Sequence, residues 1–138
     1  MKQPKILFFD LETAGVNALR SDLGFVLMCG FKWNYQKQVH VLTIAPKELA
    51  RFNDKPLLTR LSKEYTKADL TVAHFGSVFD RRFIQGRLLI NHLPPIPATK
   101  MRDTCMIARS AANFSSNRLK NLGDTLKLQH RKMDKGDG

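Results

Sequence analysis

The alternation of hydrophobic and polar positions predicts strands in the first third of the chain. Residues 5–13 form an apolar run that two acids interrupt near its end, a pattern typical of a central strand in a sheet covered on both faces. A loop follows over residues 15–24. Residues 25–33 and 38–45 are predicted as the second and third strands, and the polar residues 34–37 between them indicate a hairpin.

Helical periodicity begins in the middle of the chain. Residues 56–68 carry one apolar stripe at helical spacing, and Pro56 suits the first turn of that helix. Residues 70–75 are predicted as a fourth strand. Residues 79–91 are predicted as a second helix, which ends before a proline-rich run. The inward positions are Leu57, Leu58, Leu61 and Tyr65 in the first helix, and Phe79, Phe83, Ile84 and Leu88 in the second.

The pattern in the last third of the chain predicts one more strand and further helical segments. Residues 100–108 begin as a short strand and then turn helical. Ser115 or Ser116 is expected to cap a final helix. Its residues Leu119, Leu122 and Leu126 are expected in the core. Three strands followed by alternating helices and strands predict an α/β fold, with a mixed β-sheet flanked by helices.

Length and composition exclude several classes of protein. The chain has 138 residues, 43% of them hydrophobic and 25% charged, which fits a single globular domain over residues 1–138 and excludes a disordered or fibrous polypeptide. The longest apolar runs, residues 6–9 and 25–29, are too short for a membrane span. Cys29 and Cys105 have neither metal-binding nor disulfide spacing, so we expect both to be buried in a protein of the reducing cytoplasm.

The charge balance points to a polyanionic partner. Lys and Arg number 23 against 12 Asp and Glu, a formal net charge of +11. Because 12 of the 23 basic residues lie in residues 81–138, the excess is concentrated in the C-terminal part. A basic balance of this size favours nucleic acid as the partner over a membrane surface. Within this part, the basic residues are Arg81, Arg82, Arg87, Lys100, Arg102 and Arg109, and a second group over residues 118–135.

Asp10 and Glu12 form the first candidate for chemistry. Residues i and i+2 of a strand point to the same face, so the two carboxylates should lie side by side. Two neighbouring anions that lose hydration need a cation, and no Lys or Arg lies beside them in that strand. A divalent metal held by oxygen ligands is the economical explanation. The alternative is that the strand ends at Phe9 and both acids are hydrated.

Asp80 is the third candidate acid. The fourth strand runs into a short loop, and Asp80 then falls in the first turn of the following helix, where a negative charge suits the helix dipole. An isolated aspartate there would be a capping residue. Beside Asp10 and Glu12 it indicates a cleft at which the first and fourth strands converge.

These motifs resemble a known family. Residues 6–13, Ile-Leu-Phe-Phe-Asp-Leu-Glu-Thr, resemble the first motif of the DEDD 3′–5′ exonucleases, which have a ribonuclease H-like fold. Residues 74–80, His-Phe-Gly-Ser-Val-Phe-Asp, resemble the second motif. Residues 22–24, 102–104 and 115–119 are similar to a branch of phage and bacterial ribonuclease H-like exonucleases. The resemblance spans nearly the whole chain in the expected order.

The resemblance implies a two-metal nuclease. Asp10 would bridge two Mg²⁺ or Mn²⁺ ions, and Glu12 and Asp80 would complete their shells. Thr13 and His74 would lie near the substrate end. Asp103, which is not a metal ligand in this family, would cap or brace the segment that follows it. Arg81 and Arg82 would hold phosphates of single-stranded 3′ ends, of DNA rather than RNA, without reading their sequence.

The chain departs from the family pattern at two places. The commoner second motif has Asn where this chain has Phe75, so a polar contact there should be missing or differently made. The third motif, Tyr-x-x-x-Asp or His-x-x-x-x-Asp, should follow the last predicted helix. Residues 65–69 have the right letters but precede the second motif, so we interpret Tyr65 as core and Asp69 as a helix-end acid. Residues 130–134 are one residue short of the His form.

We therefore expect an N-terminal fragment or truncated reading frame of a metal-dependent 3′–5′ exonuclease. The first alternative is a nucleic-acid-binding module that keeps the fold without the fourth acid. A second is an endonuclease or resolvase on the same fold, against which the Phe-Asp motif argues. A third is a basic protein-interaction domain, for which the acids would be coincidental. The sequence does not identify a polymerase or helicase partner.

Overall fold

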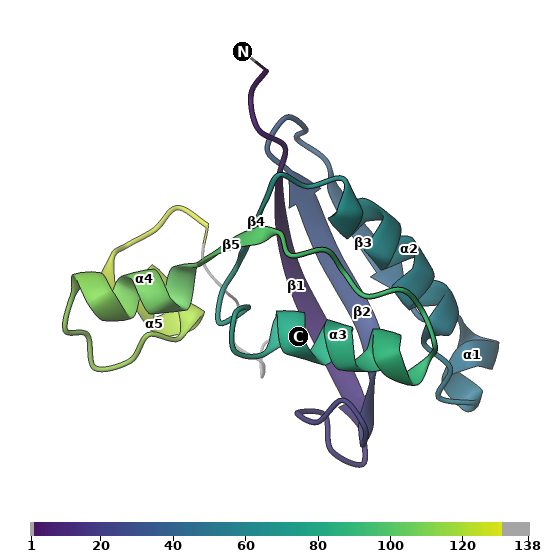
Figure 1. The fold of residues 1–138 in the computed structure, drawn as a ribbon. Coiled ribbons are helices and arrows are strands. Elements are labelled where there is room, and N and C mark those ends of the chain that lie inside the picture. Colours follow the sequence, from purple (N-terminus) through teal and green to yellow (C-terminus); the bar gives the residue numbers. More distant parts are fainter. Residues whose placement is uncertain (1, 131–138) are drawn as a thin grey trace.

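The computed structural model describes residues 2–130, which form one mixed sheet with helices (Figure 1). The strand order is β3-β2-β1-β4-β5. β1 pairs antiparallel with β2 and parallel with β4, so the predicted mixed α/β sheet is confirmed. The elements are β1 (Ile6–Gly15), β2 (Gly24–Trp33), β3 (Val39–Thr43), α1 (Pro46–Ala50), α2 (Lys55–Thr66), β4 (Leu70–Ala73), α3 (Asp80–Ile90), β5 (Lys100–Asp103), α4 (Thr104–Ala111) and α5 (Leu119–Thr125).

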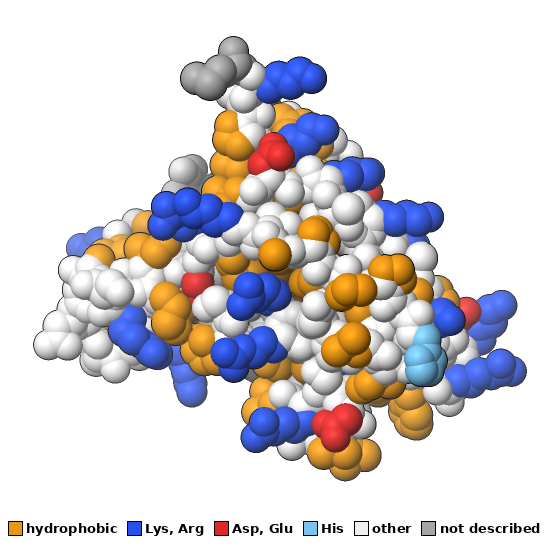
Figure 2. All heavy atoms as spheres, in the orientation of Figure 1, with side chains coloured by type: hydrophobic (Ala, Val, Ile, Leu, Met, Phe, Trp, Pro, Cys, Tyr) orange, Lys and Arg blue, Asp and Glu red, His pale blue; other side chains and the backbone are white. Residues whose placement is uncertain are grey.

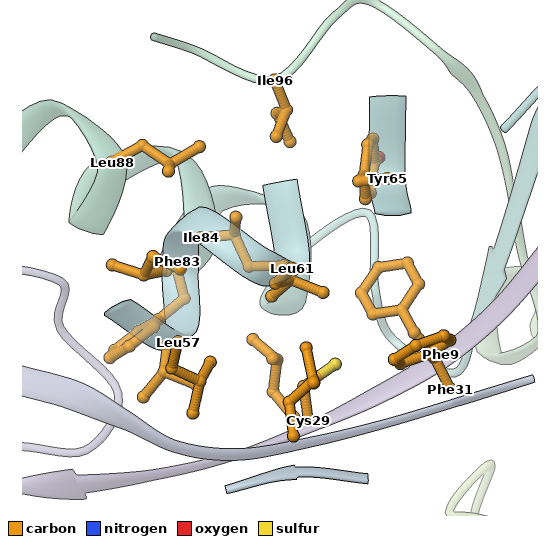
Figure 3. Packing of buried hydrophobic residues seen from close by; sticks show 14 of the residues in the cluster. Phe9, Cys29, Phe31, Leu57, Leu61, Tyr65, Phe83, Ile84, Leu88 and Ile96 are labelled. Carbon is orange, nitrogen blue, oxygen red and sulfur yellow. The ribbon is translucent and has the colours of Figure 1, made fainter. Parts of the chain in front are cut away.

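Helices α2 and α3 cover one face of the sheet and enclose the core (Figure 3). Leu7, Phe9 and Leu11 of β1 point to this face and are buried. Phe9 meets Tyr65 of α2 edge to face, with ring centroids 5.7 Å apart. Burial of each such side chain contributes roughly 1.5–3 kcal/mol. The predicted inward positions of both helices are confirmed, since seven of the eight residues are buried and Phe79 packs against them.

Helices α2 and α3 leave the opposite face of the sheet open, and Thr104 of α4 and Leu119 of α5 line a hollow of about 460 Å³ there with Phe8 and Asp10. Phe8, Val39 and Val41 are exposed there, and Asp10 and Glu12 share that face. The prediction of a central strand covered on both faces is therefore wrong for the described part of the chain. The consecutive apolar residues 6–9 gave the pattern of a doubly covered strand, but α2 and α3 both pack on the same side and leave Phe8 exposed on the other.

The last two helices lie beyond β5, away from the main core (Figure 1). The prediction that Leu119 and Leu126 belong to the core is wrong, because their side chains are 41% and 53% exposed and only Leu122 of that stripe is buried. The predicted serine cap is also wrong. The N-cap is Arg118, whose backbone N–H donates to the Ser116 hydroxyl. Helix α5 has seven residues and lies at the edge of the molecule, so Leu122 is buried while Leu119 and Leu126 stay exposed.

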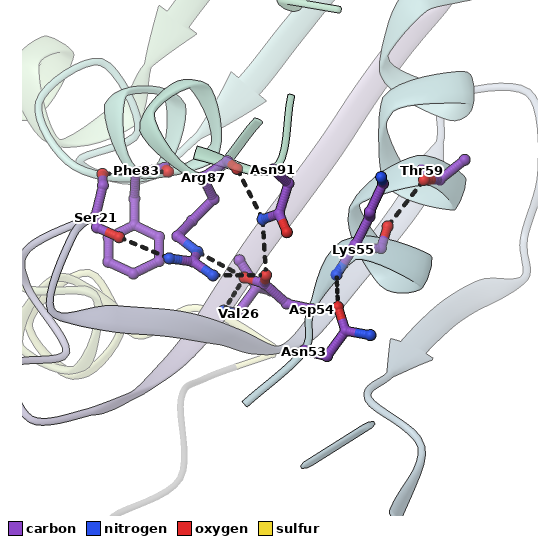
Figure 4. Close-up of polar contacts among 9 residues, drawn as sticks. All are labelled: Ser21, Val26, Asn53, Asp54, Lys55, Thr59, Phe83, Arg87 and Asn91. Atoms are coloured by element: carbon purple, nitrogen blue, oxygen red, sulfur yellow. Dashed lines mark hydrogen bonds and ion pairs between the residues drawn. The ribbon is translucent and has the colours of Figure 1, made fainter. Parts of the chain in front are cut away.

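A buried ion pair connects α3 to the start of α2 (Figure 4). The Asp54 carboxylate, fully buried, accepts from Nε and Nη2 of Arg87 at 2.9 and 2.8 Å. It also accepts from the Val26 backbone N–H and the Asn91 amide. Arg87 Nη1 donates to the Ser21 carbonyl. Arg87 was counted in the C-terminal basic excess, but its charge is buried and neutralised and does not belong to the basic surface.

No helix within residues 2–130 combines the length and the hydropathy needed to cross a membrane. Cys29 and Cys105 are both buried free thiols, as the sequence predicts.

Candidate metal site

The end of the β1–β4 pairing creates the candidate site. The parallel pairing stops at Phe8 and Val72, and β4 then ends and leads into the loop before α3. Beyond that point, no strand of residues 2–130 pairs with β1 on this side. Asp80, at the start of α3, fills the gap: its Oδ2 accepts from the Leu11 backbone N–H at 3.3 Å. The Asp80 carboxylate thus accepts a hydrogen bond from β1 where a strand neighbour would otherwise do so, and it lies next to Asp10.

Burial and a neighbouring acid make Asp80 unusual. Its side chain is 4% exposed, and burial first and the Asp10 charge second raise its pKa from 3.8 to about 7. The Leu11 N–H opposes this rise. The pKa of the Cys29 thiol rises to about 12, mainly through burial, with both Asp80 and Asp10 adding to it. Both carboxylates therefore act on the same small region of the sheet.

Glu12 is not gathered with the other two acids. It lies on the exposed face of β1 together with Asp10, as the spacing predicts, and a register shift in the β1–β2 pairing follows it directly. Within residues 2–130, no three His, Cys, Asp or Glu side chains are arranged to hold a metal ion. The structure thus brings together two of the three predicted acids, Asp10 and Asp80.

The chemistry of this pair fits a divalent cation. Carboxylate oxygens are the ligands that Mg²⁺ and Mn²⁺ prefer. A cation beside Asp80 would favour its ionised form and offset the burial and the repulsion from Asp10 that raise its pKa. The donor set therefore fits an ion held by Asp10 and Asp80.

Asp103 shapes the loop that delivers Asp80. It accepts from the backbone N–H groups of Phe75 and Ser77 and from the Ser77 hydroxyl. It also caps α4 by accepting from the N–H groups of Cys105 and Met106, so the predicted capping role is confirmed. Burial alone would raise the pKa of Asp103, but these hydrogen bonds outweigh it and lower the pKa. This aspartate is therefore a structural anion.

The same loop contains a residue in an uncommon conformation. Phe75 has φ of 62°, in the left-handed region, where a non-glycine residue costs roughly 1–2 kcal/mol. Asn, which the commoner second motif has here, tolerates that region more readily. The next residue must be glycine, since a Cβ on Gly76 would lie 2.4 Å from the Cβ of Ala73. The turn is tight, and it directs the chain from β4 into α3.

Thr13 and His74 have structural partners. The Thr13 hydroxyl donates to the Ala18 carbonyl at 2.6 Å and so closes the loop after β1. His74 Nε2 donates to the Asn117 carbonyl at 2.6 Å, since a carbonyl can only accept. Its Nδ1 lies 2.9 Å from the Thr104 hydroxyl. Both ring nitrogens of His74 are thus engaged in joining β4 to α4 and to the segment before α5.

Comparison with known proteins places the chain in a family. The profile of the family described as RNase_H superfamily matches residues 7–137. The chain belongs to the ribonuclease H superfamily. No curated protein sequence matches it. Solved structures do match its fold, at identities of 13–17%.

Three of these structures are nucleic-acid enzymes. A family B DNA polymerase from the archaeon Pyrobaculum calidifontis matches with a TM-score of 0.75 and 13% identity, over 94% of this chain and 19% of that one. Escherichia coli exonuclease I, in a zinc-bound complex with single-stranded DNA, matches with a TM-score of 0.75 and 17% identity, over 94% of this chain and 36% of that one. The same enzyme with a dT13 oligonucleotide matches with a TM-score of 0.70 and 16% identity, over 88% of this chain and 35% of that one. The ribonuclease H-like chain thus spans about a fifth to a third of their lengths, and its fold is similar to that of DEDD-type exonucleases.

The predicted phosphate-binding arginines of this ribonuclease H-like domain are exposed. Arg81 and Arg82 follow Asp80 on α3 and, with Gln85 and residues 96–98, line a hollow of about 320 Å³. Figure 2 shows Lys and Arg side chains distributed over the face that it draws rather than gathered into a single patch.

Two residues with the letters of a third motif have structural roles. Tyr65 is fully buried in the core, as predicted. The Asp69 carboxylate accepts from the Lys5 backbone N–H at 2.7 Å and fixes the start of β1. Among the later residues, Asp134 lies outside the described part of the chain. The Asp54–Arg87 pair was not identified from the sequence, because 33 residues separate its members and neither belongs to a motif.

Proposed function

We propose that this domain is a metal-dependent 3′–5′ exonuclease that hydrolyses phosphodiester bonds of nucleic acid. The observation that carries the proposal is the pair of adjacent carboxylates, Asp10 on β1 and buried Asp80 on α3, within a ribonuclease H-like fold. The two free, buried cysteines support a cytoplasmic location for the proposed enzyme.

Asp10 and Asp80 would hold Mg²⁺ or Mn²⁺, with Glu12 contributing from the exposed face of β1. Two such ions supply an activated water and stabilise the leaving 3′ oxygen in nucleases of this type. The protein's own part is to fix the carboxylates. The Leu11 N–H orients Asp80, and Asp103 holds the turn from which Asp80 projects. Asp10, on the exposed face, is the acid that substrate can approach.

Single-stranded nucleic acid is the proposed substrate. The matched exonuclease I structures contain single-stranded DNA and dT13, and the net charge of +11 favours a polyanion. Arg81 and Arg82, one and two residues after Asp80, would contact phosphates without reading bases. His74 and Thr13 would support the substrate end through the segments that they hold in place, and we propose DNA rather than RNA as the substrate.

A second candidate function is a binding module without catalysis. It is favoured by one observation: residues 2–130 gather two acids, not three or four, at the candidate site. Three carboxylates of Asp10, Glu12 and Asp80 would carry three negative charges against the four positive charges of two divalent ions. A module of this kind would bind single strands and leave them intact.

Release of mononucleotides from a 3′-labelled single strand in the presence of Mn²⁺ separates these functions. We expect release by the wild type and a loss of at least about 100-fold in Asp10→Asn and Asp80→Asn, because each removes a metal ligand. Asp22→Asn, a change at an exposed aspartate outside the pair, is the matched control and should retain activity. Intact oligonucleotide that remains bound to the wild type would support the module instead.

A further inference from the structure

The edge strand β3 offers unpaired backbone groups. It is the terminal strand of the sheet and pairs with β2 on one side only (Figure 1). The Ile44 N–H donates to the Leu27 carbonyl, so alternate residues His40 and Leu42 also direct their backbone toward β2. The N–H and C=O groups of Val39, Val41 and Thr43 therefore point away from the sheet.

This edge strand has no charged residue, proline or bulge that would oppose pairing with another strand. Natural sheets protect exposed edges with charged residues, proline or bulges. Residues 39–43 contain no Lys, Arg, Asp, Glu or Pro, and the β2–β3 register runs without a shift. The side chains of Val39 and Val41 are 63% and 57% exposed on the face opposite α2 and α3. An added strand could place β-branched side chains against them.

A groove with net positive charge follows the other side of the same edge. It has a volume of about 1060 Å³ and lies between β3, α2 and the proline-rich segment after α3. Arg60, Lys63, Lys67 and Glu64 line it. Lys67 is paired with Glu64 at 3.2 Å, whereas Arg60 and Lys63 form no ion pair with any residue in the described range 2–130. Two basic side chains are thus free to receive carboxylates.

We propose that β3 and this groove bind an extended acidic peptide, which adds to the sheet as a sixth strand. Its backbone would pair with the outward groups of Val39, Val41 and Thr43. Because side chains alternate along a strand, acidic residues would point into the groove toward Arg60 and Lys63, and the intervening apolar residues would lie beside Val39 and Val41. The groove is lined by neither Asp10 nor Asp80, and the proposal does not depend on the proposed function.

The observations favour an acidic peptide over two other occupants. A second copy that paired β3 with β3 would bring two grooves of the same charge together, and each chain carries +11. A nucleic acid would satisfy Arg60 and Lys63 but would place phosphates near the outward carbonyl groups of β3, which are negative dipole ends. A peptide satisfies both the cations and the backbone.

The test is fluorescence anisotropy with a labelled peptide of alternating Glu and Val, longer than β3 by a few residues. Peptides with Lys in place of Glu, or with a central Pro, are the peptide controls. Val41→Pro removes an outward N–H without removing a bond to β2, and proline is tolerated on edge strands. Arg60→Glu with Lys63→Glu reverses the groove charge. Arg51→Glu with Lys47→Glu makes the same charge change at exposed residues outside the groove.

We expect the acidic peptide to bind and both control peptides to bind at least tenfold more weakly. Val41→Pro and the groove double variant should each weaken binding at least tenfold, whereas the control double variant should change it less than threefold. Thermal melts monitored by circular dichroism establish that each variant is folded. Equal binding of the proline-containing peptide, or unchanged binding to Val41→Pro, would overturn the proposal. So would displacement of the peptide by a single-stranded oligonucleotide at this groove, or self-association that Val41→Pro abolishes.

Discussion

At the scale of single residues, the candidate site depends on a carboxylate placed where burial opposes its charge. Asp80 projects from α3 onto a stretch of β1 beyond the end of its pairing with β4, and it accepts a hydrogen bond there from the Leu11 N–H. The nearby Asp10 charge adds repulsion. A buried carboxylate beside a second acid lowers the stability of the fold when no cation is near, and it is tolerated at sites that bind a cation.

Asp80→Asn should therefore stabilise the metal-free protein at high pH. The folded-state pKa of about 7 lies above the ordinary value of 3.8, so the favourable contribution of the neutral acid is present below about pH 4 and is lost as the pH rises through about 7. We expect a gain of about 1–3 kcal/mol at pH 8 and little difference at pH 4. The amide oxygen can still accept from the Leu11 N–H.

Urea unfolding with a chelator present, at both pH values, measures this difference. Asp22→Asn is the control for replacing an exposed aspartate, and it should change stability by less than about 0.5 kcal/mol. A loss of stability in Asp80→Asn at pH 8 would show that the ionised carboxylate holds the fold together, and the argument for a cation would fail.

At the scale of elements, the apolar periodicity of the sequence predicted the strands and helices whose ends it defines. The strand at residues 25–33 and the helix at residues 79–91 match β2 and α3 within one residue at each end, because long apolar periodicity and proline signals define them. Helix α1 was missed, since its five residues bury no side chain. The start of α5 and the exposure of its leucines were also wrong. Whether an apolar stripe finds a partner depends on tertiary packing, which periodicity does not contain.

The sequence also predicted part of the candidate site. Alternation along β1 correctly placed Asp10 and Glu12 on one face, and the convergence of β1 and the β4 end correctly brought Asp80 near Asp10. The sequence did not show that Asp80 is buried against Leu11, or that His74 is engaged at both ring nitrogens. Both depend on partners distant in sequence.

Arg87→Met should destabilise the protein strongly, because it leaves the Asp54 carboxylate buried without its cation. We expect a loss of about 3–5 kcal/mol in urea unfolding. The double variant Asp54→Asn with Arg87→Met should lose clearly less than the sum of the two single losses, since the remaining partner no longer carries a buried charge. A loss below about 1 kcal/mol in Arg87→Met would contradict the assigned role of this pair in connecting α3 to the start of α2.

At the scale of the whole molecule, the proposed nucleic-acid partner is argued first from charge. The domain carries +11, and Arg87 is one cation that burial removes from the surface. On the face drawn in Figure 2, Lys and Arg side chains are distributed rather than gathered, which favours binding along a flexible polyanion over a single anion pocket. The apolar face beside Asp10 and Glu12 stays open among the described residues.

Binding of a single-stranded oligonucleotide should fall steeply with salt. Each neutralised phosphate contributes a slope of about −0.7 to the logarithmic dependence of affinity on salt, because counterions are released. Arg81→Ala with Arg82→Ala should therefore reduce the slope by about 1.4. Lys47→Ala with Arg51→Ala, on and just after α1, is the control and should reduce it less. Affinity that does not change with salt would remove the electrostatic argument for nucleic acid.

The central claim is that Asp10 and Asp80 together hold a divalent cation. Titration of Mn²⁺ followed by the electron paramagnetic resonance signal of the free ion tests it most directly, at pH 8, where Asp80 is mainly ionised. The account predicts that the wild type and Asp22→Asn remove free Mn²⁺ equally. It predicts binding at least tenfold weaker in both Asp10→Asn and Asp80→Asn. Wild-type Mn²⁺ affinity in the Asp80→Asn variant would contradict the claim.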